Sequence, residues 1–220
     1  MQNYLQILST CKLFESISPS DLLTMLTCLS ASVRSYIKGE FIFSEGEAPS
    51  RVGVVLTGSV HIIREDFYGS RVLLTVSEAP DVFGEAFACA EAAELPVSAV
   101  AASDCAVLLC DYRRIVKSCT NACEFHARLI QNMLNILANK NLSLTRKLEH
   151  LTQHNTREKL LSYLSEIARL TGNSRFTIPL NRQELADYLA VERSAMSAEL
   201  SRMKTDGLLT YEKNKFELLP

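Results

Sequence analysis

The stretch from Asn181 to Leu209 constrains the fold most, because it encodes two short helices joined by a tight turn. Asn181 is a suitable N-cap, and Glu184 follows three residues later, at the spacing of a capping box. A second helix is expected over about Arg193 to Asp206, and Gly207 stands where such a helix ends. Two helices with a connection this short are typical of a helix-turn-helix, whose second helix enters the major groove of DNA.

The outward positions of the second helix carry hydroxyl and guanidinium groups, which suit phosphates and base edges. They are Arg193, Ser194, Ser197, Ser201 and Arg202. Residues 155–220 hold ten Lys and Arg against nine Asp and Glu, whereas the whole chain has a net charge of −2. The sign of this difference favours DNA at the C-terminus only weakly. The alternative is a helical hairpin inside an ordinary core.

In the first half of the chain, the spacing of apolar residues changes from a helical period to the alternation of strands. Ser18 caps a helix that runs to about Ser30, with Pro19 at its first position. Short alternating segments then predict strands over 33–37, 40–43, 52–57, 59–64, 71–77 and 97–111, with glycines between them. Strands this short and evenly spaced favour a small barrel or jelly roll that can hold a small ligand.

A long helix is expected from Thr120–Asn121 to about residue 153, and apolar residues recur along it at alternating spacings of four and three. This seam consists of Ile130, Leu134, Leu137, Asn141, Leu144, Leu148 and Leu151. A polar Asn141 at one seam position favours a parallel, in-register homodimer over a helix buried in its own domain. A second stripe is expected to face the barrel: Phe125, Leu129, Met133 and Ile136.

Asn155 and Glu158 have capping-box spacing and mark a hinge where a new helix begins over about Lys159 to Leu170. A strand over 176–180 and a terminal hairpin over 208–218 would complete a winged helix-turn-helix. The expected fold is therefore α+β, with a jelly-roll barrel, a dimerisation helix and a winged helix-turn-helix. The expected domains are residues 1–120, 121–154 and 155–220.

This order of elements, together with several local motifs, resembles the Crp/Fnr family of bacterial transcription regulators. The resemblance covers nearly the whole chain and rests on the segments Gly39–Gly46, Val55–Val60, Phe83–Glu85, Asn155–Glu158, Arg182–Leu185 and Glu192–Ser194. It implies that Arg193, with Ser194 beside it, lies at the base-reading start of the recognition helix, that Gln183 holds a phosphate and that Arg202 clamps the DNA backbone. The expected DNA-binding set is Arg182, Gln183, Arg193, Ser194, Ser197 and Arg202. Double-stranded DNA with a near-palindromic operator and a second copy of the chain are the expected partners, and RNA polymerase is a further candidate.

The sequence departs from the family in the segment that would hold a cyclic phosphate. Cyclic-nucleotide binders of this family carry an Arg-Ser or Arg-Thr pair there, whereas this chain has Leu95 and Pro96, and residues 86–102 contain no Arg or Lys. A buried phosphate without a cation is costly, so the expected effector is an unknown small molecule other than cAMP. The expected effector pocket consists of Gly84, Glu85, Ala86, Leu95, Pro96 and Ser143, with Asn132 and Asn139 as further candidates.

Two other readings stay open. The first is a redox- or metal-responsive regulator, suggested by Cys119, Cys123 and His126, which have i, i+4, i+7 spacing at an expected helix start. They are too few for a structural zinc site, and Cys11 and Cys28 are too few for an N-terminal iron–sulfur cluster. No metal or other cofactor is therefore expected. The other reading is a barrel-and-coil interaction protein that does not bind DNA.

The remaining signals exclude other classes of protein. His61 is the one histidine of the expected barrel, too few for a metal-dependent enzyme of that fold, and no nucleophile elbow or nucleotide-binding loop is present. His150 and His154 fall outside the seam and are expected on a solvated face. Seven cysteines at irregular spacing do not form a disulfide framework. Without a signal segment or a long apolar run, we expect a cytoplasmic protein with no membrane partner and no enzymatic activity.

Overall fold

A computed structural model describes residues 2–66, 68, 71–116 and 124–219 of the chain. The chain divides into two compact units, residues 1–138 and 139–220. The division falls inside the long helix α5 (Glu124–Leu151), which therefore contributes its first part to one unit and its last part to the other. Each unit has a hydrophobic core of its own.

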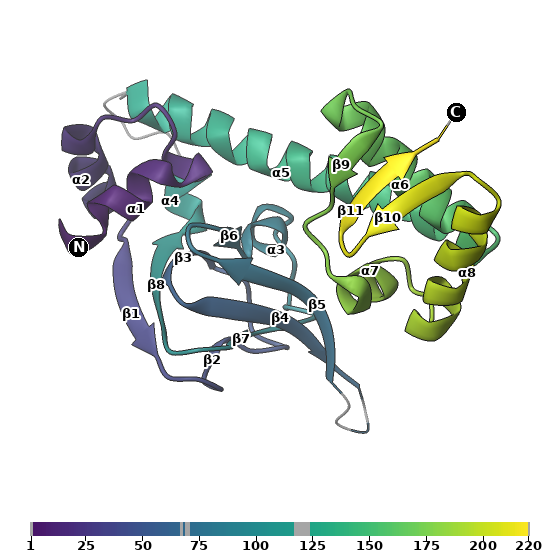
Figure 1. The fold of residues 1–220 in the computed structure, drawn as a ribbon. Helices are drawn as coiled ribbons and strands as arrows, with labels where there is room; N and C mark the ends of the chain where they lie inside the picture. Colours follow the sequence, from purple (N-terminus) through teal and green to yellow (C-terminus); the bar gives the residue numbers. More distant parts are fainter. Residues whose placement is uncertain (1, 67, 69–70, 117–123, 220) are drawn as a thin grey trace. The chain divides into compact units, whose positions relative to one another are not determined.

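The first unit contains two four-stranded antiparallel sheets that form the expected jelly roll (Figure 1). The sheets have the strand orders β1-β8-β3-β6 and β2-β7-β4-β5. Their strands are β1 (Ser32–Tyr36), β2 (Phe41–Phe43), β3 (Arg51–Thr57), β4 (Ser59–Glu65), β5 (Arg71–Glu78), β6 (Val82–Phe83), β7 (Ser98–Ala101) and β8 (Cys105–Asp111). Apolar residues of both sheets, including Val55, Val60 and Val107, form one cluster that fills the space between them.

Short helices accompany the sheets of this unit, and several of them contribute to a second apolar cluster. The helical segments are η1 (Gln2–Tyr4), α1 (Leu5–Thr10), η2 (Lys12–Phe14), α2 (Pro19–Cys28), α3 (Glu85–Cys89) and α4 (Tyr112–Val116). The Ser18 hydroxyl accepts a hydrogen bond from the Asp21 amide and caps α2, as predicted. The second cluster joins Phe14, Leu26 and Leu108 to Leu129 and Met133 of α5.

The second apolar stripe of α5 lies in this cluster, as expected. Leu129, Met133 and Ile136 are buried there, and Phe125 packs against it while partly exposed. Buried Asn132 lies beside this stripe, and its amide nitrogen donates to the carbonyls of Leu13 and Glu15. Asn132 thus holds the N-terminal segment onto α5, which differs from the ligand contact considered for it from the sequence.

The prediction of a single strand over 97–111 is wrong, because a turn divides this segment into β7 and β8. Side chains of the turn bond distant backbone groups. The Ser103 hydroxyl accepts from the Ser59 amide, and the Asp104 carboxylate accepts from the Lys38 amide. The first five predicted strands are present, with ends that differ by one residue or less.

The second unit is a winged helix-turn-helix around one apolar core. Beyond the end of α5 it contains α6 (Thr156–Thr171), β9 (Arg175–Thr177), α7 (Arg182–Tyr188), α8 (Arg193–Thr205), β10 (Leu209–Glu212) and β11 (Lys215–Leu218). The three strands form an antiparallel sheet in the order β10-β11-β9. The Asn155 side chain caps α6, and Leu164, Leu185, Leu200 and Phe216 are among the core residues. No helix of the described residues is long and apolar enough to cross a membrane.

Candidate nucleic-acid interface and sensor cavity

The helix-turn-helix is fixed at both helix starts by side-chain caps. Asn181 accepts hydrogen bonds from the amides of Gln183 and Glu184, and Glu184 accepts from the Asn181 amide, which completes the predicted capping box. Glu192 caps α8 by accepting from the amides of Ser194 and Ala195. The hydrogen bond from the Ser194 hydroxyl, together with these two, holds the pKa of the Glu192 carboxyl below the ordinary value. The cap residue of α8 was not predicted, although an acid before a helix start is a recognisable signal.

The exposed face of α8 carries the residues predicted to contact DNA. Arg193, Ser194 and Arg202 are exposed, and Ser197 is half-buried. The Arg193 guanidinium makes no hydrogen bond or ion pair with any described residue, so its donors are available. The Ser194 hydroxyl donates to Glu192, and the Ser197 hydroxyl donates to the Arg193 carbonyl.

The two predicted contact residues of α7 differ in environment. Gln183 is exposed, and its amide nitrogen donates to Asp187 at 2.8 Å. Arg182 is half-buried, with its guanidinium carbon 4.8 Å from the ring centre of Tyr211 and 5.0 Å from that of Phe216. Burial lowers the pKa of Arg182, and its buried Nη2 has no hydrogen-bond partner among the described residues. Arg182 therefore packs on the aromatic side chains of the wing hairpin, β10 and β11.

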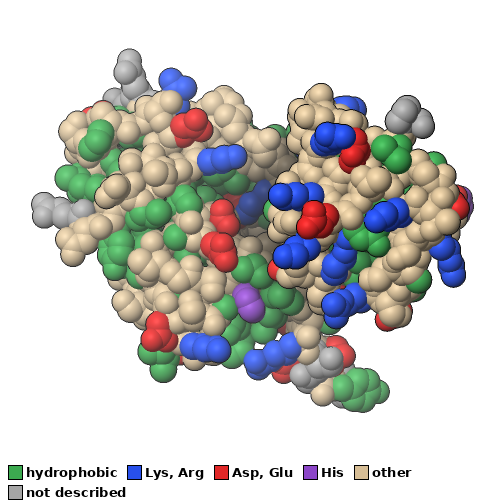
Figure 2. All heavy atoms as spheres, viewed as in Figure 1, with side chains coloured by type: hydrophobic (Ala, Val, Ile, Leu, Met, Phe, Trp, Pro, Cys, Tyr) green, Lys and Arg blue, Asp and Glu red, His purple; other side chains and the backbone are tan. Residues whose placement is uncertain are grey.

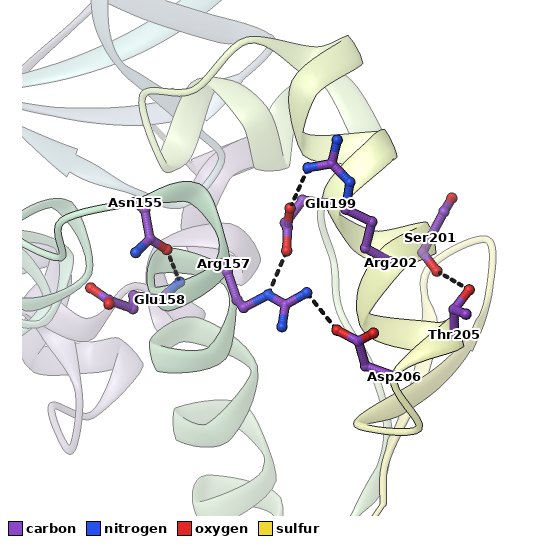
Figure 3. A network of polar contacts seen from close by, with 8 residues as sticks. All are labelled: Asn155, Arg157, Glu158, Glu199, Ser201, Arg202, Thr205 and Asp206. Atoms are coloured by element: carbon purple, nitrogen blue, oxygen red, sulfur yellow. Dashed lines mark hydrogen bonds and ion pairs between the residues drawn. The ribbon is translucent and has the colours of Figure 1, made fainter.

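An ion-pair network joins the start of α6 to the far end of α8 (Figure 3). Arg157 Nε lies 2.5 Å from Glu199 Oε1, and Arg157 Nη2 lies 2.6 Å from Asp206 Oδ2. Arg202 Nη1 lies 3.1 Å from the other oxygen of Glu199. The hydrogen bond from Arg157 lowers the pKa of the Glu199 carboxyl. This network fixes the orientation of α8 relative to α6.

Basic side chains gather on one face of the second unit, where Figure 2 shows several Lys and Arg groups over the winged helix-turn-helix. Exposed arginines on α8 contribute to the positive charge of the unit, which the phosphate backbone of DNA would attract. The chain as a whole carries a net charge of −2. The positive charge is therefore local to a surface and is not a property of the whole protein.

A polar cluster around His150 joins the last turns of α5 to α6. His150 is 2% exposed, and its ring nitrogens lie 2.8 Å from the Ser162 hydroxyl and 2.8 Å from Glu166 Oε2. Arg146 Nε forms an ion pair with Glu166 Oε1 at 3.2 Å, and the Tyr163 ring meets the imidazole edge-on. The expectation of a solvated face is therefore wrong for His150, because α6 covers it. His154 is exposed, as expected.

The seam predicted along α5 is largely uncovered in the single chain. Leu134 is 56% exposed, Leu144 63% and Leu148 60%, and Asn141 is also exposed. Ile130, Leu137 and Leu151 are half-buried. A row of exposed leucines on one helix is unusual unless another surface covers it.

The first unit contains a cavity of about 220 Å³ at one end of the jelly roll. Its lining is Arg34, Tyr36, Ile42, Phe43, Glu47, Ala48, Pro49, Ser50, Arg51, Gly84, Leu95 and Leu109. Gly84 has a φ of 78°, and a Cβ there would approach the Phe43 ring to 3.0 Å, so this position requires glycine.

Two of the predicted pocket residues, Gly84 and Leu95, line this cavity. Glu85 is buried at the start of α3, and Ala86 and Pro96 are exposed beside it. Ser143 is exposed on α5, in the second unit.

Five polar residues of the cavity were missed from the sequence: Arg34, Tyr36, Glu47, Ser50 and Arg51. In the register of the sheet, Arg34 lies opposite Val107 and Tyr36 opposite Cys105, and both of these partners belong to the core between the sheets. Cross-strand partners share a face of the sheet, so Arg34 and Tyr36 lie on the inner face of β1, where Tyr36 is half-buried and Arg34 stays exposed. Burial raises the pKa of Tyr36, which the charges of Arg34 and Arg51 lower in part.

The cysteine and histidine residues do not form a metal site within the described part of the chain, where no group of three such ligands occurs. Cys119 and Cys123 lie outside the described residues. His126 is buried, with Nε2 3.9 Å from the sulfur of Cys28. Burial raises the pKa of the Cys110 thiol to about 12, which makes it a poor nucleophile.

Comparisons with known proteins agree with both parts of the chain. Residues 33–120 match the model of the cyclic nucleotide-binding domain, and residues 158–219 match the Crp-like helix-turn-helix domain. The transcriptional activator protein FnrL of Cereibacter sphaeroides is 26% identical over 188 residues, which cover 81% of this chain and 73% of that protein.

Solved structures show the same fold. The catabolite activator protein of Thermus thermophilus has a TM-score of 0.55 at 22% identity, with 94% of this chain and 93% of that chain covered. The c-di-GMP-responsive global regulator CLP of Xanthomonas campestris has a TM-score of 0.59 at 20% identity, with 92% and 100% covered. The two matched domains, in this order and on this fold, show that the chain belongs to the Crp/Fnr family of DNA-binding transcription regulators, with an effector-binding domain before the helix-turn-helix.

Proposed function

We propose that this chain acts in the cytoplasm as a homodimer that binds a near-palindromic operator under the control of a small molecule other than cAMP. The observation that carries the proposal is the capped start of α8, where the exposed Arg193 guanidinium has no partner among the described residues. A guanidinium at the N-terminal end of a recognition helix can donate two hydrogen bonds to guanine O6 and N7.

The other contacts would position the helix on the phosphate backbone. Gln183 at the start of α7 and Arg202 on α8 are exposed donors, and Ser194 and Ser197 add hydroxyls close to Arg193. Arg182 would act through the wing, because its guanidinium packs on Tyr211 and Phe216. Phosphate contacts fix register and orientation, whereas base contacts select the sequence.

The exposed seam of α5 supports the dimer. Pairing two copies would cover Leu134, Leu144 and Leu148, which are more than half exposed in the single chain. Asn141 would meet its own copy across the axis and favour a parallel register at some cost in stability. A parallel dimer has two-fold symmetry, so the operator half-sites should lie about 10 base pairs apart or a multiple of that distance.

The cation-free segment of residues 86–102 supports an effector other than cAMP. Leu95 is 5% exposed and offers the cavity an apolar wall at a place where the family resemblance would require a cation. We expect calorimetry of the full chain with cAMP to show no binding in the micromolar range. Micromolar affinity would contradict this part of the proposal.

The DNA-binding part is tested by selecting random duplex DNA on the reduced full chain, with Arg193→Ala in parallel. We expect an enriched palindrome that is lost in the variant, because a bidentate arginine contact is worth about 1–3 kcal/mol per base pair. Arg175→Ala is the matched control, since Arg175 is 75% exposed and pairs with Glu217 on the neighbouring strand β11. Equal binding by wild type and Arg193→Ala would refute the role of Arg193. No enrichment, with or without cell extract, would refute DNA recognition.

A further inference from the structure

Two arginines that lack an acidic partner line the cavity of the jelly roll, and both stay exposed to solvent. Arg34 on β1 and Arg51 on β3 both line it, from strands that flank β8. Neither forms an ion pair with a described carboxylate. Glu47 is the one acid in the lining, and its Oε2 accepts a hydrogen bond from the Ser44 amide at 3.2 Å. Two cations on the wall of one cavity repel each other, and an anion between them would relieve this repulsion.

The two arginines and Tyr36 line the same wall of the cavity. Arg34 and Tyr36 lie two residues apart on one face of β1, opposite Val107 and Cys105 of β8, and Arg51 lies opposite Asp111 on the same face of β8. The three side chains therefore place guanidinium and phenol groups close together at the same wall. Guanidinium groups bind carboxylates and phosphates through two parallel hydrogen bonds, and a phenol can add a third donor.

The cavity also has apolar walls. Ile42, Phe43, Leu95 and Leu109 line it, and Phe43 packs against Phe83 with ring centres 5.6 Å apart. The volume of about 220 Å³ exceeds the cavity of about 150 Å³ that holds a benzene molecule in another protein. The cavity therefore has room for an apolar body of ring size together with one charged group.

We infer that the cavity binds a small organic acid, with its carboxylate held by Arg34, Arg51 and Tyr36 and its apolar body against Phe43 and Leu95. The inference rests on the proposed sensor function and specifies its ligand class. The cations missing from residues 86–102 are supplied instead by two strands of the facing sheet. An acid bound here would touch Gly84, which directly precedes α3, so occupancy can be communicated to that helix.

The test is calorimetry of the full chain without DNA, with benzoate as the probe. Benzamide is its neutral counterpart, and inorganic phosphate is an anion without an apolar body. We expect benzoate to bind one per chain, and its dissociation constant to rise about tenfold or more in Arg34→Gln and in Arg51→Gln, because each change removes charge-assisted hydrogen bonds. Benzamide should bind about tenfold more weakly than benzoate for the same reason.

Arg64→Gln is the control variant, because Arg64 is exposed on β4 and does not line the cavity. It should bind benzoate like the wild type, and circular dichroism should show all three variants folded. The inference is overturned by no benzoate binding up to about 20 mM, a concentration that detects millimolar affinity. It is also overturned by equal binding of benzamide, by binding that both glutamine variants retain, or by phosphate binding as tightly as benzoate. Because no DNA is present, these outcomes are independent of the operator selection.

Discussion

The buried imidazole of His150 should be a principal stabilising contact of the second unit. His150→Ala removes a hydrogen bond to Ser162, worth about 1 kcal/mol, and one to the Glu166 carboxylate, worth about 1.5–3 kcal/mol. The buried ring adds a packing contribution of about 1 kcal/mol, which is set below that of a wholly apolar side chain because the imidazole is polar. We therefore expect the opening free energy of α6 to fall by about 3–5 kcal/mol.

Hydrogen exchange measured by mass spectrometry on the full chain would report this loss, because it follows local opening in each segment separately. Amides of α6 should exchange about a hundredfold to several thousandfold faster in His150→Ala, since 1.4 kcal/mol corresponds to a factor of ten. Ser162→Ala, which leaves one ring nitrogen without its partner, should lie between this variant and the wild type, at about 1–3 kcal/mol.

His154→Ala is the matched control, because His154 lies four residues further along and is exposed. Its backbone amide donates to Glu158, and this bond survives the substitution. The control should change the opening free energy by no more than about 0.5 kcal/mol. If His150→Ala and His154→Ala gave the same exchange rates in α6, the contribution assigned to the buried cluster would be refuted.

Three further predictions concern single residues. Gly58→Ala should destabilise the first unit by about 1–3 kcal/mol in thermal unfolding, because φ is 74° and a Cβ would lie 2.4 Å from the Asp104 carbonyl oxygen; an unchanged Tm would contradict this. Cys110, with its pKa raised to about 12, should resist iodoacetamide in the folded protein and react once unfolded, as peptide mapping can show. Because the pKa of Glu199 is lowered from its ordinary value of 4.5, ionised Glu199 stabilises the fold at pH values above 4.5. This stability is lost as the pH falls through the lowered pKa. Arg157→Ala should therefore flatten the acid limb of the stability curve, and an unaltered limb would contradict the pairing.

The features predicted best from sequence are those fixed by neighbouring residues. The caps Asn181 and Asn155 and the helix stop at Gly207 act within a few positions of the chain, so the helix-turn-helix and the start of α6 were predicted close to their observed bounds. The family resemblance supplied the order of the domains. The apolar stripe of α5 was assigned correctly because a helix face has a fixed period.

The features missed from sequence depend on contacts between distant segments. The turn that divides 97–111 is held by Ser59 and Lys38, which the alternation of the strand does not reveal. His150 is buried by α6, which the heptad spacing cannot show. Arg34 escaped notice because it is an exposed polar residue, and only the pairing of β1 with β8 shows that it lies beside the cavity. The alternation of one strand does not show which strands lie next to it.

The separation between the hydrophobic cores of the first and second units has a consequence for how this protein can evolve. A substitution that weakens the cluster around Leu108 in the first unit leaves the cluster around Leu200 in the second unit with all its contacts. Stability effects at distant sites with no shared partners are nearly additive. Whether a mutation in one unit is tolerated therefore depends on the stability of that unit alone. Selection can thus alter the cavity for a new signal while the recognition helix keeps its operator, and the reverse change is equally open.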